Sequence, residues 1–305
     1  MQTTADALLT LRDCLRFAVS RFTQAGLVHG HGITNALDDA AFLILETLHL
    51  PVDQLEPWLD ARLLPAERLA LVEIIEKRVS TRKPSVYLVQ KAYIQGVPFF
   101  IDERVIVPRS YLGEMLAGPL APTLFGPEEG NLIGEPHGVT RILDLCTGSG
   151  CLAILAALHF ENATVDGVEL SNEAMAVAKR NVAEHGLEER VRLFQGDLFK
   201  PVKGEGYDLI IANPPYVARA VVEAFPPEYA AEPRMAHLGG EDGLALVRRI
   251  IDGARQHLTP EGGLLCEIGE DRALLEAEYP DLNFLWLDST ESEGEVFWLR
   301  AEDLA

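Results

Sequence analysis

The residues Asn213-Pro214-Pro215-Tyr216 follow the apolar run YDLIIA and combine an amide, two rigid rings and a phenol. Proline has a fixed φ and no backbone N–H, so two consecutive prolines end a strand and stiffen the turn after it. The Asn213 side-chain carbonyl and the Pro214 backbone carbonyl are acceptors, and the Tyr216 ring is a flat surface. Together they suit a planar –NH2 group, held by both N–H bonds and stacked on the ring.

The nitrogen of an amide or arylamine is a poor nucleophile because its lone pair is delocalised. Fixing its two N–H bonds would direct the lone pair at an electrophile, and positioning and electrostatics would then carry the rate. We therefore predict that Asn213, Pro214 and Tyr216 are catalytic, and that the same residues with Pro215 and Phe100 bind the substrate. For Phe100, a place in the core of the predicted hairpin is an equally good interpretation. For the motif alone, a Pro-Pro loop with a core tyrosine is the simpler interpretation.

A glycine-rich turn, DLCTGSGCLAI, joins an apolar run to a helical pattern upstream of this corner. Gly148 and Gly150 allow a tight turn and a close approach of the backbone to a ligand. The stretch Gly148–Ala153 fits the dinucleotide pattern G-x-G-x-x-A. It also fits D-x-x-x-G-x-G, beginning at Asp144, which is typical of S-adenosylmethionine (AdoMet) methyltransferases. AdoMet carries ammonium and sulfonium cations and no pyrophosphate, so a carboxylate near the turn favours it.

Acidic residues stand at the ends of the next two predicted strands. Glu169, at the first, can accept both ribose hydroxyls, and Asp197, at the second, can accept from an adenine amino group with Leu198 against the ring. Either acid taken singly also suits a helix cap. Three strand ends in succession favour a ligand site, because ligands bind at the carboxyl ends of parallel strands. The predicted cofactor residues are Asp144, Cys146, Thr147, Gly148, Ser149, Gly150, Glu169, Asp197, Leu198 and Asn213.

The elements that would position these residues follow from the hydrophobic pattern. From residue 141 onward, short apolar runs alternate with helical patterns, which predicts an α/β fold with a mostly parallel sheet covered on both faces. The last two runs, 283–289 and 294–300, have no helix between them. They predict an antiparallel C-terminal hairpin at the sheet edge.

The chain divides into three predicted parts. Residues 1–83 carry apolar residues at helical spacing and predict a small helical domain for substrate docking. Residues 84–108 alternate and are rich in aromatic and β-branched residues, which predicts a β-hairpin linker. The catalytic domain would then span residues 109–305. Within it, the glycine- and proline-rich segment 117–139 predicts a loop, and the long segment 225–243 predicts a lid over the corner.

The charge and composition of the chain limit the classes of molecule that it is expected to bind. The chain has 305 residues and a net charge of −21, nearly all of it beyond residue 95. Proteins that bind nucleic acid typically present a basic field, so this charge counts against nucleic acid and favours a basic protein, although acidity also serves solubility. No apolar run is long enough to span a membrane, the N-terminus does not read as a secretion signal, and no cysteine or histidine spacing indicates a metal site. These features predict a cytoplasmic protein.

The whole chain resembles the bacterial protein-(glutamine-N5) methyltransferases, which share the N-P-P-Y corner. Among them it is most similar to the branch that modifies large-subunit ribosomal protein number three. The stretches that carry this likeness are RFTQAGLVHGHGITNALDDA, IVPRSYL, DLCTGSGC, PPEYAAEP, GEDGLALVRRI and YPDLNFLWL. Cys146 stands where release-factor relatives usually have glycine, and Glu169 replaces the commoner aspartate.

The resemblance implies a class I Rossmann-like AdoMet-dependent methyltransferase domain preceded by a helical domain. It further implies transfer of methyl to the side-chain N5 of a glutamine in a basic ribosomal protein, with S-adenosylhomocysteine as product. The alternatives are a release-factor glutamine methyltransferase, an N6-adenine or guanine-N2 nucleic-acid methyltransferase, and an AdoMet-binding ribosome assembly factor without turnover. A nicotinamide-dependent dehydrogenase ranks last.

Overall fold

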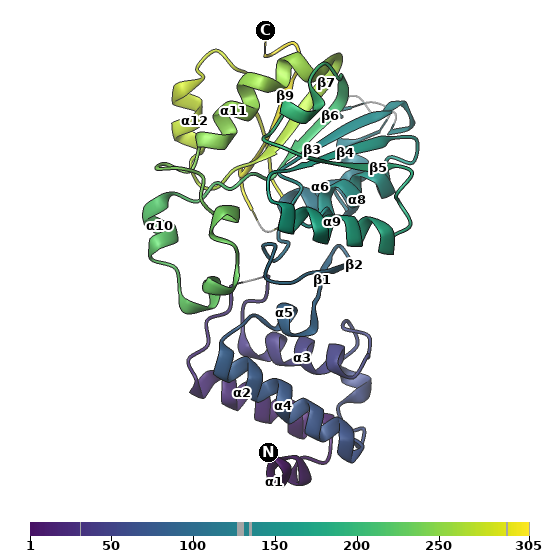
Figure 1. Cartoon of the computed structure of the whole chain (residues 1–305), viewed down its shortest axis with the longest axis vertical. Helices are drawn as coiled ribbons and strands as arrows, with labels where there is room; N and C mark the ends of the chain where they lie inside the picture. Colours follow the sequence, from purple (N-terminus) through teal and green to yellow (C-terminus); the bar gives the residue numbers. More distant parts are fainter. Residues whose placement is uncertain (31, 127–130, 134–135, 291, 305) are drawn as a thin grey trace. The chain divides into compact units, whose positions relative to one another are not determined.

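The structure, a computed structural model, describes residues 1–30, 32–126, 131–133, 136–290 and 292–304 (Figure 1). The chain forms two compact units. The helical unit comprises Met1–Ala92, Ile101–Glu103 and Phe225–Ala231, and the sheet unit comprises Tyr93–Phe100, Arg104–Ala224 and Glu232–Ala305. Parts of the predicted loop at 117–139 and one histidine of the HGHG stretch at 29–32 lie outside the described residues.

The helical unit is built from amphipathic helices around one apolar core. Its α-helices are α1 (Gln2–Ala7), α2 (Leu11–Gln24), α3 (Ala36–Thr47), α4 (Pro65–Thr81) and α5 (Ser85–Val89). Local capping sets their starts: the Thr10 side chain accepts from the backbone N–H of Asp13, and the Asn35 side chain accepts from the N–H groups of Leu37 and Asp38. Helices α1 to α4 lie within residues 1–83, where apolar residues recur at helical spacing.

The sheet unit contains a seven-stranded sheet in the order β5-β4-β3-β6-β7-β9-β8. Its strands are β3 (Arg141–Leu145), β4 (Thr164–Glu169), β5 (Val191–Gln195), β6 (Tyr207–Ala212), β7 (Leu258–Glu267), β8 (Leu285–Leu287) and β9 (Val296–Arg300). Strands β3 to β7 are parallel, whereas β9 runs antiparallel to both β7 and β8. The predicted α/β fold, with a mostly parallel sheet and an antiparallel C-terminal hairpin, is confirmed.

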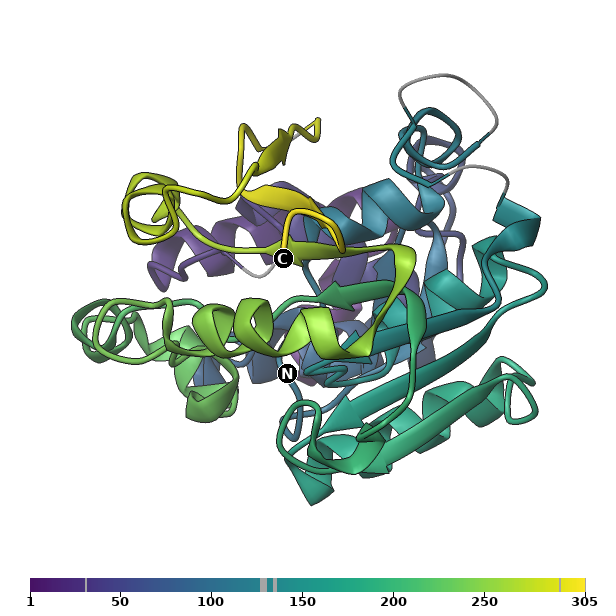
Figure 2. The same cartoon turned by 90° about the horizontal axis from the view of Figure 1, so that it is seen from above.

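Helices cover the sheet on both faces (Figure 2). Neighbouring residues of a strand point to opposite sides, so Ile142 joins the core under α6, α8 and α9, whereas Leu143 joins the core under α11 and α12. These helices are α6 (Tyr111–Ala117), α8 (Cys151–His159), α9 (Asn172–Glu184), α11 (Ala245–Ala254) and α12 (Arg272–Glu278). Double coverage explains why the strands read as continuous apolar runs.

Two smaller features complete the fold. Strands β1 (Lys91–Ile94) and β2 (Val97–Phe100) form a separate two-stranded sheet, so the predicted hairpin exists but ends before residue 107. The predicted loop at 117–139 includes a short helix, α7 (Ala121–Leu124). In the part of the chain that the structure describes, none of the helices has the length and apolar character needed to cross a membrane.

Candidate cofactor and substrate site

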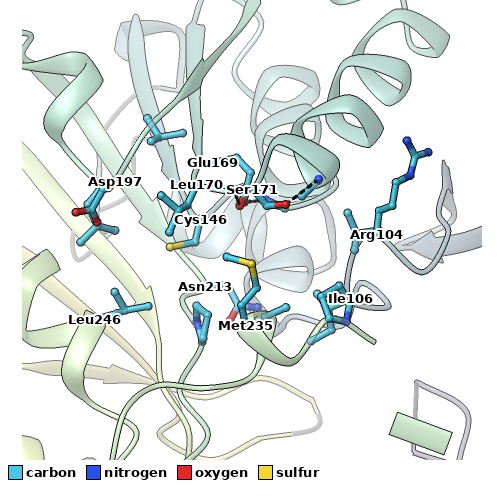
Figure 3. A pocket seen from close by; sticks show the side chains of 18 of the residues that line it. Arg104, Ile106, Cys146, Glu169, Leu170, Ser171, Asp197, Asn213, Met235 and Leu246 are labelled. Atoms are coloured by element: carbon cyan, nitrogen blue, oxygen red, sulfur yellow. Dashed lines mark hydrogen bonds between the residues drawn. The ribbon is translucent and has the colours of Figure 1, made fainter. Parts of the chain in front are cut away.

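A cavity of the sheet unit lies at the carboxyl ends of the neighbouring parallel strands β5, β4, β3 and β6 (Figure 3). The turns that follow these strands line it with Cys146, Gly148, Glu169, Leu170, Asp197, Leu198, Asn213 and Pro215. Residues 104–106, together with Met235 and Ala236, add to the wall. The structure thus brings six of the ten predicted cofactor residues to one cavity, at the sheet edge where α/β proteins bind ligands.

Glu169 is held at the cavity by the backbone. The N–H of Gly148 donates to Oε2 at 2.9 Å, and the N–H of Ser171 donates to Oε1 at 2.7 Å. The residue is only 8% exposed, yet each carboxylate oxygen has more than one lone pair. The carboxylate is therefore fixed in direction and can still accept hydroxyl groups, which fits the predicted contact with a ribose.

Replacing Glu169 with alanine is expected to weaken AdoMet binding by about tenfold or more, because hydrogen bonds to a charged group contribute about 1.5–3 kcal/mol. Isothermal titration of the full chain with AdoMet measures the effect. Glu188→Ala, at an exposed position of the same unit, is the matched control and should leave the affinity unchanged. Equal affinities for the two variants would remove Glu169 from the cofactor site.

Asp144 lies beneath the glycine-rich turn and is fully buried, outside the cavity wall. One oxygen, Oδ2, accepts from the Thr147 hydroxyl and from the N–H of Ala153 at 3.0 Å, which ties the turn to the start of α8. Burial raises the pKa of Asp144 to about 7. The other oxygen, Oδ1, has no hydrogen-bond partner among the described residues, so a donor supplied by a ligand would satisfy it.

The remaining residues of the turn shape its backbone. Thr147 donates its N–H to the Val168 carbonyl at 3.0 Å, and the Ser149 carbonyl accepts from the Asn181 side chain at 2.8 Å. Gly150 has φ 81°, and a Cβ there would lie 3.3 Å from Ala178. The structure does not bring Thr147, Ser149 or Gly150 to the cavity wall, although all three belong to the turn that contributes Cys146 and Gly148 to it.

Cys146 adopts a left-handed backbone conformation with φ 60°. Glycine takes this conformation freely, whereas another residue is strained by about 1–2 kcal/mol. The backbone conformation at this position is therefore one that favours glycine. This chain has a cysteine there instead, and that residue forms part of the cavity wall. Burial raises the pKa of the Cys146 thiol far above its usual value, which keeps it neutral.

Asp197 lines the cavity but is already paired. Its carboxylate accepts from Lys200 at 2.8 Å and from Arg249 at 2.7 Å, and these hydrogen bonds lower its pKa. Leu198, beside it, has φ 50° and is 6% exposed. The predicted contact with an adenine amino group therefore requires a carboxylate lone pair of Asp197 that is not used by Lys200 or Arg249.

The proline corner follows β6 directly. Asn213 and Pro215 line the cavity, whereas Pro214 is buried and Tyr216 is half-buried. The Asn213 Nδ2 lies 3.5 Å from the Arg109 backbone carbonyl, a long and weak contact that nevertheless directs the amide N–H bonds toward that segment. The Asn213 Oδ1 is then the atom free to accept from a ligand.

A second loop supports the corner from behind, and sequence reasoning missed its role. Val217 donates to the His237 carbonyl, and Gly239 donates to the Val217 carbonyl, both at 2.9 Å. A Cβ on Gly239 would lie 2.7 Å from the Pro215 carbonyl oxygen, and a Cβ on Gly243 would lie 2.4 Å from that of Tyr216. Gly239 and Gly243 are therefore required by the close approach of the corner's backbone.

The structure does not bring Phe100 to this cavity. Its backbone N–H and carbonyl are both bound by the buried Asn181 side chain, and the Arg180 guanidinium lies 3.4 Å from the centre of its ring. Arg109 pairs with Glu232 through both terminal nitrogens, at 3.0 and 3.2 Å. The described residues hold no cluster of three or more potential metal ligands.

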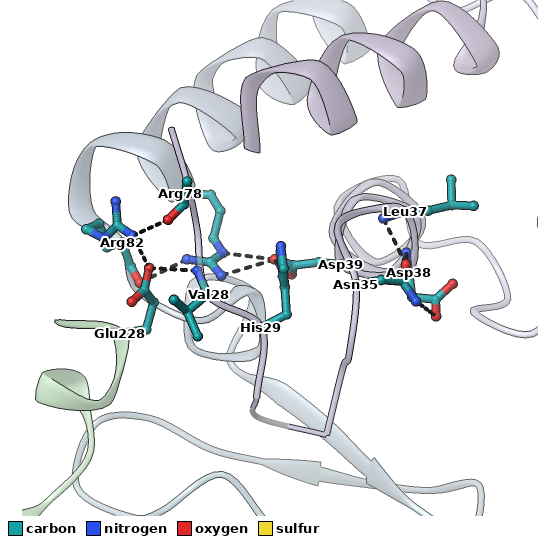
Figure 4. A network of polar contacts seen from close by, with 10 residues as sticks. Val28, His29, Asn35, Leu37, Asp38, Asp39, Arg78, Arg82 and Glu228 are labelled. Atoms are coloured by element: carbon teal, nitrogen blue, oxygen red, sulfur yellow. Dashed lines mark hydrogen bonds and ion pairs between the residues drawn. The ribbon is translucent and has the colours of Figure 1, made fainter. Parts of the chain in front are cut away.

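The predicted lid at 225–243 divides between the units. Pro233, Met235 and Ala236 line the cavity of the sheet unit. The segment Phe225–Ala231 belongs to the helical unit, where the buried Glu228 accepts from the N–H of Val28 at 3.0 Å and pairs with Arg82 (Figure 4). This pairing holds the segment to the helices, and the lid remains a prediction.

Comparison with known proteins covers both the domain and the full chain. Residues 134–225 match the protein family described as the methyltransferase small domain. A relative from Bradyrhizobium diazoefficiens is 56% identical over 299 residues, which cover 97% of this chain and 92% of that protein. A relative from Burkholderia pseudomallei is 49% identical and covers 100% of this chain and 98% of that protein.

A third relative, from Bordetella pertussis, is 48% identical over 97% of both chains. All three are named ribosomal protein uL3 glutamine methyltransferase. The likeness extends over nearly the full length of each. The chain belongs to the family of ribosomal protein uL3 glutamine methyltransferases.

Proposed function

We propose that this methyltransferase places the methyl group of AdoMet on the side-chain amide nitrogen (N5) of a glutamine in ribosomal protein uL3. The observation that carries the proposal is the shared wall of the cavity. Asn213 and Pro215, from the corner suited to a planar amide, line the same cavity as Glu169, whose carboxylate is fixed by two backbone N–H groups. An acceptor amide and a nucleoside cofactor would therefore meet there.

The cavity's own residues fit AdoMet, which supplies an electrophilic methyl group on its sulfonium when bound. Glu169 would hold the ribose hydroxyls, and Asp197 and Leu198 would border the adenine. The wall between them is largely apolar, with Val168, Leu170, Met235 and Leu246 available to the flat base. Asp144 lies behind the glycine-rich turn, and its unpartnered oxygen would accept from a donor of the cofactor; a nearby cationic group would favour its ionised form.

The corner would position the glutamine amide. The Asn213 Oδ1 and the Pro214 carbonyl accept its two N–H bonds, and the Tyr216 ring lies against its plane. The lone pair is thereby turned away from these acceptors and toward the cofactor side of the cavity. A side-chain base is not required beforehand, because the nitrogen becomes acidic once the new bond forms and then releases one proton.

Charge supports a basic protein substrate. The chain carries 47 acidic and 26 basic residues, and such a field attracts a basic protein and repels nucleic acid. We assign residues 1–83 to substrate docking, residues 84–108 to a linker and residues 109–305 to catalysis. A cytoplasmic enzyme acting on uL3 before or during ribosome assembly, when the glutamine is accessible, fits these features.

Incubation of the purified chain with free uL3 and methyl-labelled AdoMet tests the proposal. The expected result is label on one glutamine of uL3, located by peptide mass spectrometry as a gain of one methylene. A release factor, duplex DNA and ribosomal RNA serve as competing acceptors in parallel reactions. Label absent from uL3, or preferred on any of these acceptors, would overturn the assignment. Cofactor binding without label on any acceptor would favour the assembly-factor alternative.

A further inference from the structure

A buried carboxylate that the mechanism above does not use lies directly behind the corner. Glu267, the last residue of β7, is 1% exposed and accepts hydrogen bonds from two other parts of the sheet unit. Its Oε1 accepts from the Tyr216 hydroxyl at 2.8 Å. Its Oε2 accepts from the Ser110 hydroxyl at 2.6 Å and from the N–H of Tyr111, where α6 begins, at 3.0 Å.

This arrangement fixes the phenol at both ends. The hydroxyl of Tyr216 is tied to Glu267, and the ring edge lies against the backbone of Gly269, where a Cβ would be 3.2 Å from the Tyr216 ring. The segment that donates to the other oxygen also approaches the first residue of the corner, through the Arg109 carbonyl near Asn213. One short stretch, 109–111, therefore approaches the first residue of the corner directly and is linked to the last one through Glu267.

We propose that Glu267 is a positioning residue for methyl transfer, which holds the plane of the Tyr216 ring against the acceptor amide. The identity of the acceptor amide rests on the proposed function, whereas the hydrogen bonds between Glu267, Tyr216 and the start of α6 do not depend on it. A buried carboxylate is costly to keep unless donors satisfy it, and here three donors converge on it from two chain segments. The buried Glu267 carboxylate is therefore fully hydrogen-bonded only when the Tyr216 ring keeps this orientation.

A double-mutant cycle tests the link. Tyr216→Phe removes the hydroxyl and keeps the ring, whereas Glu267→Gln keeps a carbonyl oxygen for the start of α6 and removes the acceptor for the phenol proton. Each variant is expected to lower kcat for uL3 by about tenfold with the AdoMet Kd unchanged, and the double variant by about tenfold as well, since both remove the same bond. A loss of about a hundredfold in the double variant would contradict the proposal.

A matched control separates positioning from burial. Glu114, also buried in the sheet unit, accepts from the N–H and hydroxyl of Thr290, and among the described residues its side-chain hydrogen bonds go there and not to the corner. Glu114→Gln should leave kcat unchanged. Thermal unfolding of each variant establishes that the chain is folded. A fall in kcat for Glu114→Gln equal to that for Glu267→Gln would assign the effect to the fold and overturn the proposal.

The pH profile gives a second measurement. Burial raises the pKa of Glu267 to about 7, and only the ionised form accepts on both oxygens. At saturating AdoMet, kcat should therefore fall as pH drops through about 7, and Glu267→Gln should weaken this dependence. Ser110, Tyr111, Tyr216 and Cys266 act on or respond to Glu267, and Arg109 acts on Tyr216; the pKa values of Tyr216 and Cys266 are raised well above their usual values. The pKa of Asp144 is also raised to about 7, so part of the dependence can remain in Glu267→Gln, but a profile identical in wild type and Glu267→Gln would contradict the proposal.

A measurement made without any methyl acceptor tests the role of Glu267 independently of the proposed uL3 methylation. In protein labelled with carbon-13 at the tyrosine Cζ, the Tyr216 signal is identified by its loss in Tyr216→Phe. It should shift between acidic and alkaline sides of neutral pH in the wild type and stay constant in Glu267→Gln. A constant wild-type signal would overturn the role of Glu267 even if uL3 is methylated, whereas a shifting signal would stand even if uL3 is not the substrate.

Discussion

Replacing Asn213 with alanine is expected to lower kcat for uL3 methylation by about 10²–10³-fold, comparable to the loss of one acceptor or donor that holds a reacting group. The Asn213 Oδ1 is the exposed acceptor of the corner, because the amide nitrogen faces the Arg109 carbonyl. Removing it frees one N–H bond of the acceptor amide, so the lone pair loses its direction. Initial rates with labelled AdoMet and AdoMet affinity by calorimetry together measure the effect.

The AdoMet affinity decides between two roles for this residue. Asn213 lines the same cavity as Glu169, so a cofactor contact is also open to it. If Asn213 holds the substrate, the AdoMet Kd stays nearly unchanged while kcat collapses. An equal loss of both would move Asn213 to the cofactor site. Asn283→Ala, at an exposed position bound to Asp303, is the matched control and should behave as wild type.

The fold was predictable because its signals are local. The runs at 141–145 and 207–212 are apolar and bounded by polar turns, and each is followed by helical spacing, which is the pattern of a doubly covered parallel sheet. The terminal hairpin at the sheet edge was also predicted, but the order of its two strands was not. Strand β9 lies between β7 and β8. This order depends on which strand edges pair, and the local spacing of apolar residues carries no information on that pairing.

The residues of the site that stand at the ends of strands were predictable from the sequence. Glu169, Asp197 and Asn213 each end or follow a parallel strand, and the structure places them in one cavity. Phe100 was predicted to bind the substrate, but no local pattern in the sequence shows that Asn181 and Arg180, about 80 residues later, pack against it. Glu267 had a signal that was not used, since a charged residue at the end of the run GGLLCEI must find partners when the strand is buried.

Gly243→Ala is expected to lower kcat by about 10²-fold, although the residue does not line the cavity. A Cβ there would lie 2.4 Å from the backbone oxygen of Tyr216, and neither backbone can yield as a flexible side chain can. The corner must therefore shift, and small displacements of reacting groups are costly in rate. The AdoMet Kd should change much less, because Glu169 and Asp197 are held by other segments.

Backbone strain must be separated from this contact, and the chain offers the comparison. Gly204 has φ +87° and Gly243 has φ +85°, but a Cβ on Gly204 would meet nothing within 4 Å. Alanine at either position carries the same left-handed strain of about 1–2 kcal/mol, so Gly204→Ala should lose thermal stability and keep kcat. If both variants lose kcat equally, strain alone is the cause. A defect confined to Gly243→Ala would show that turnover depends on the backbone position of the corner.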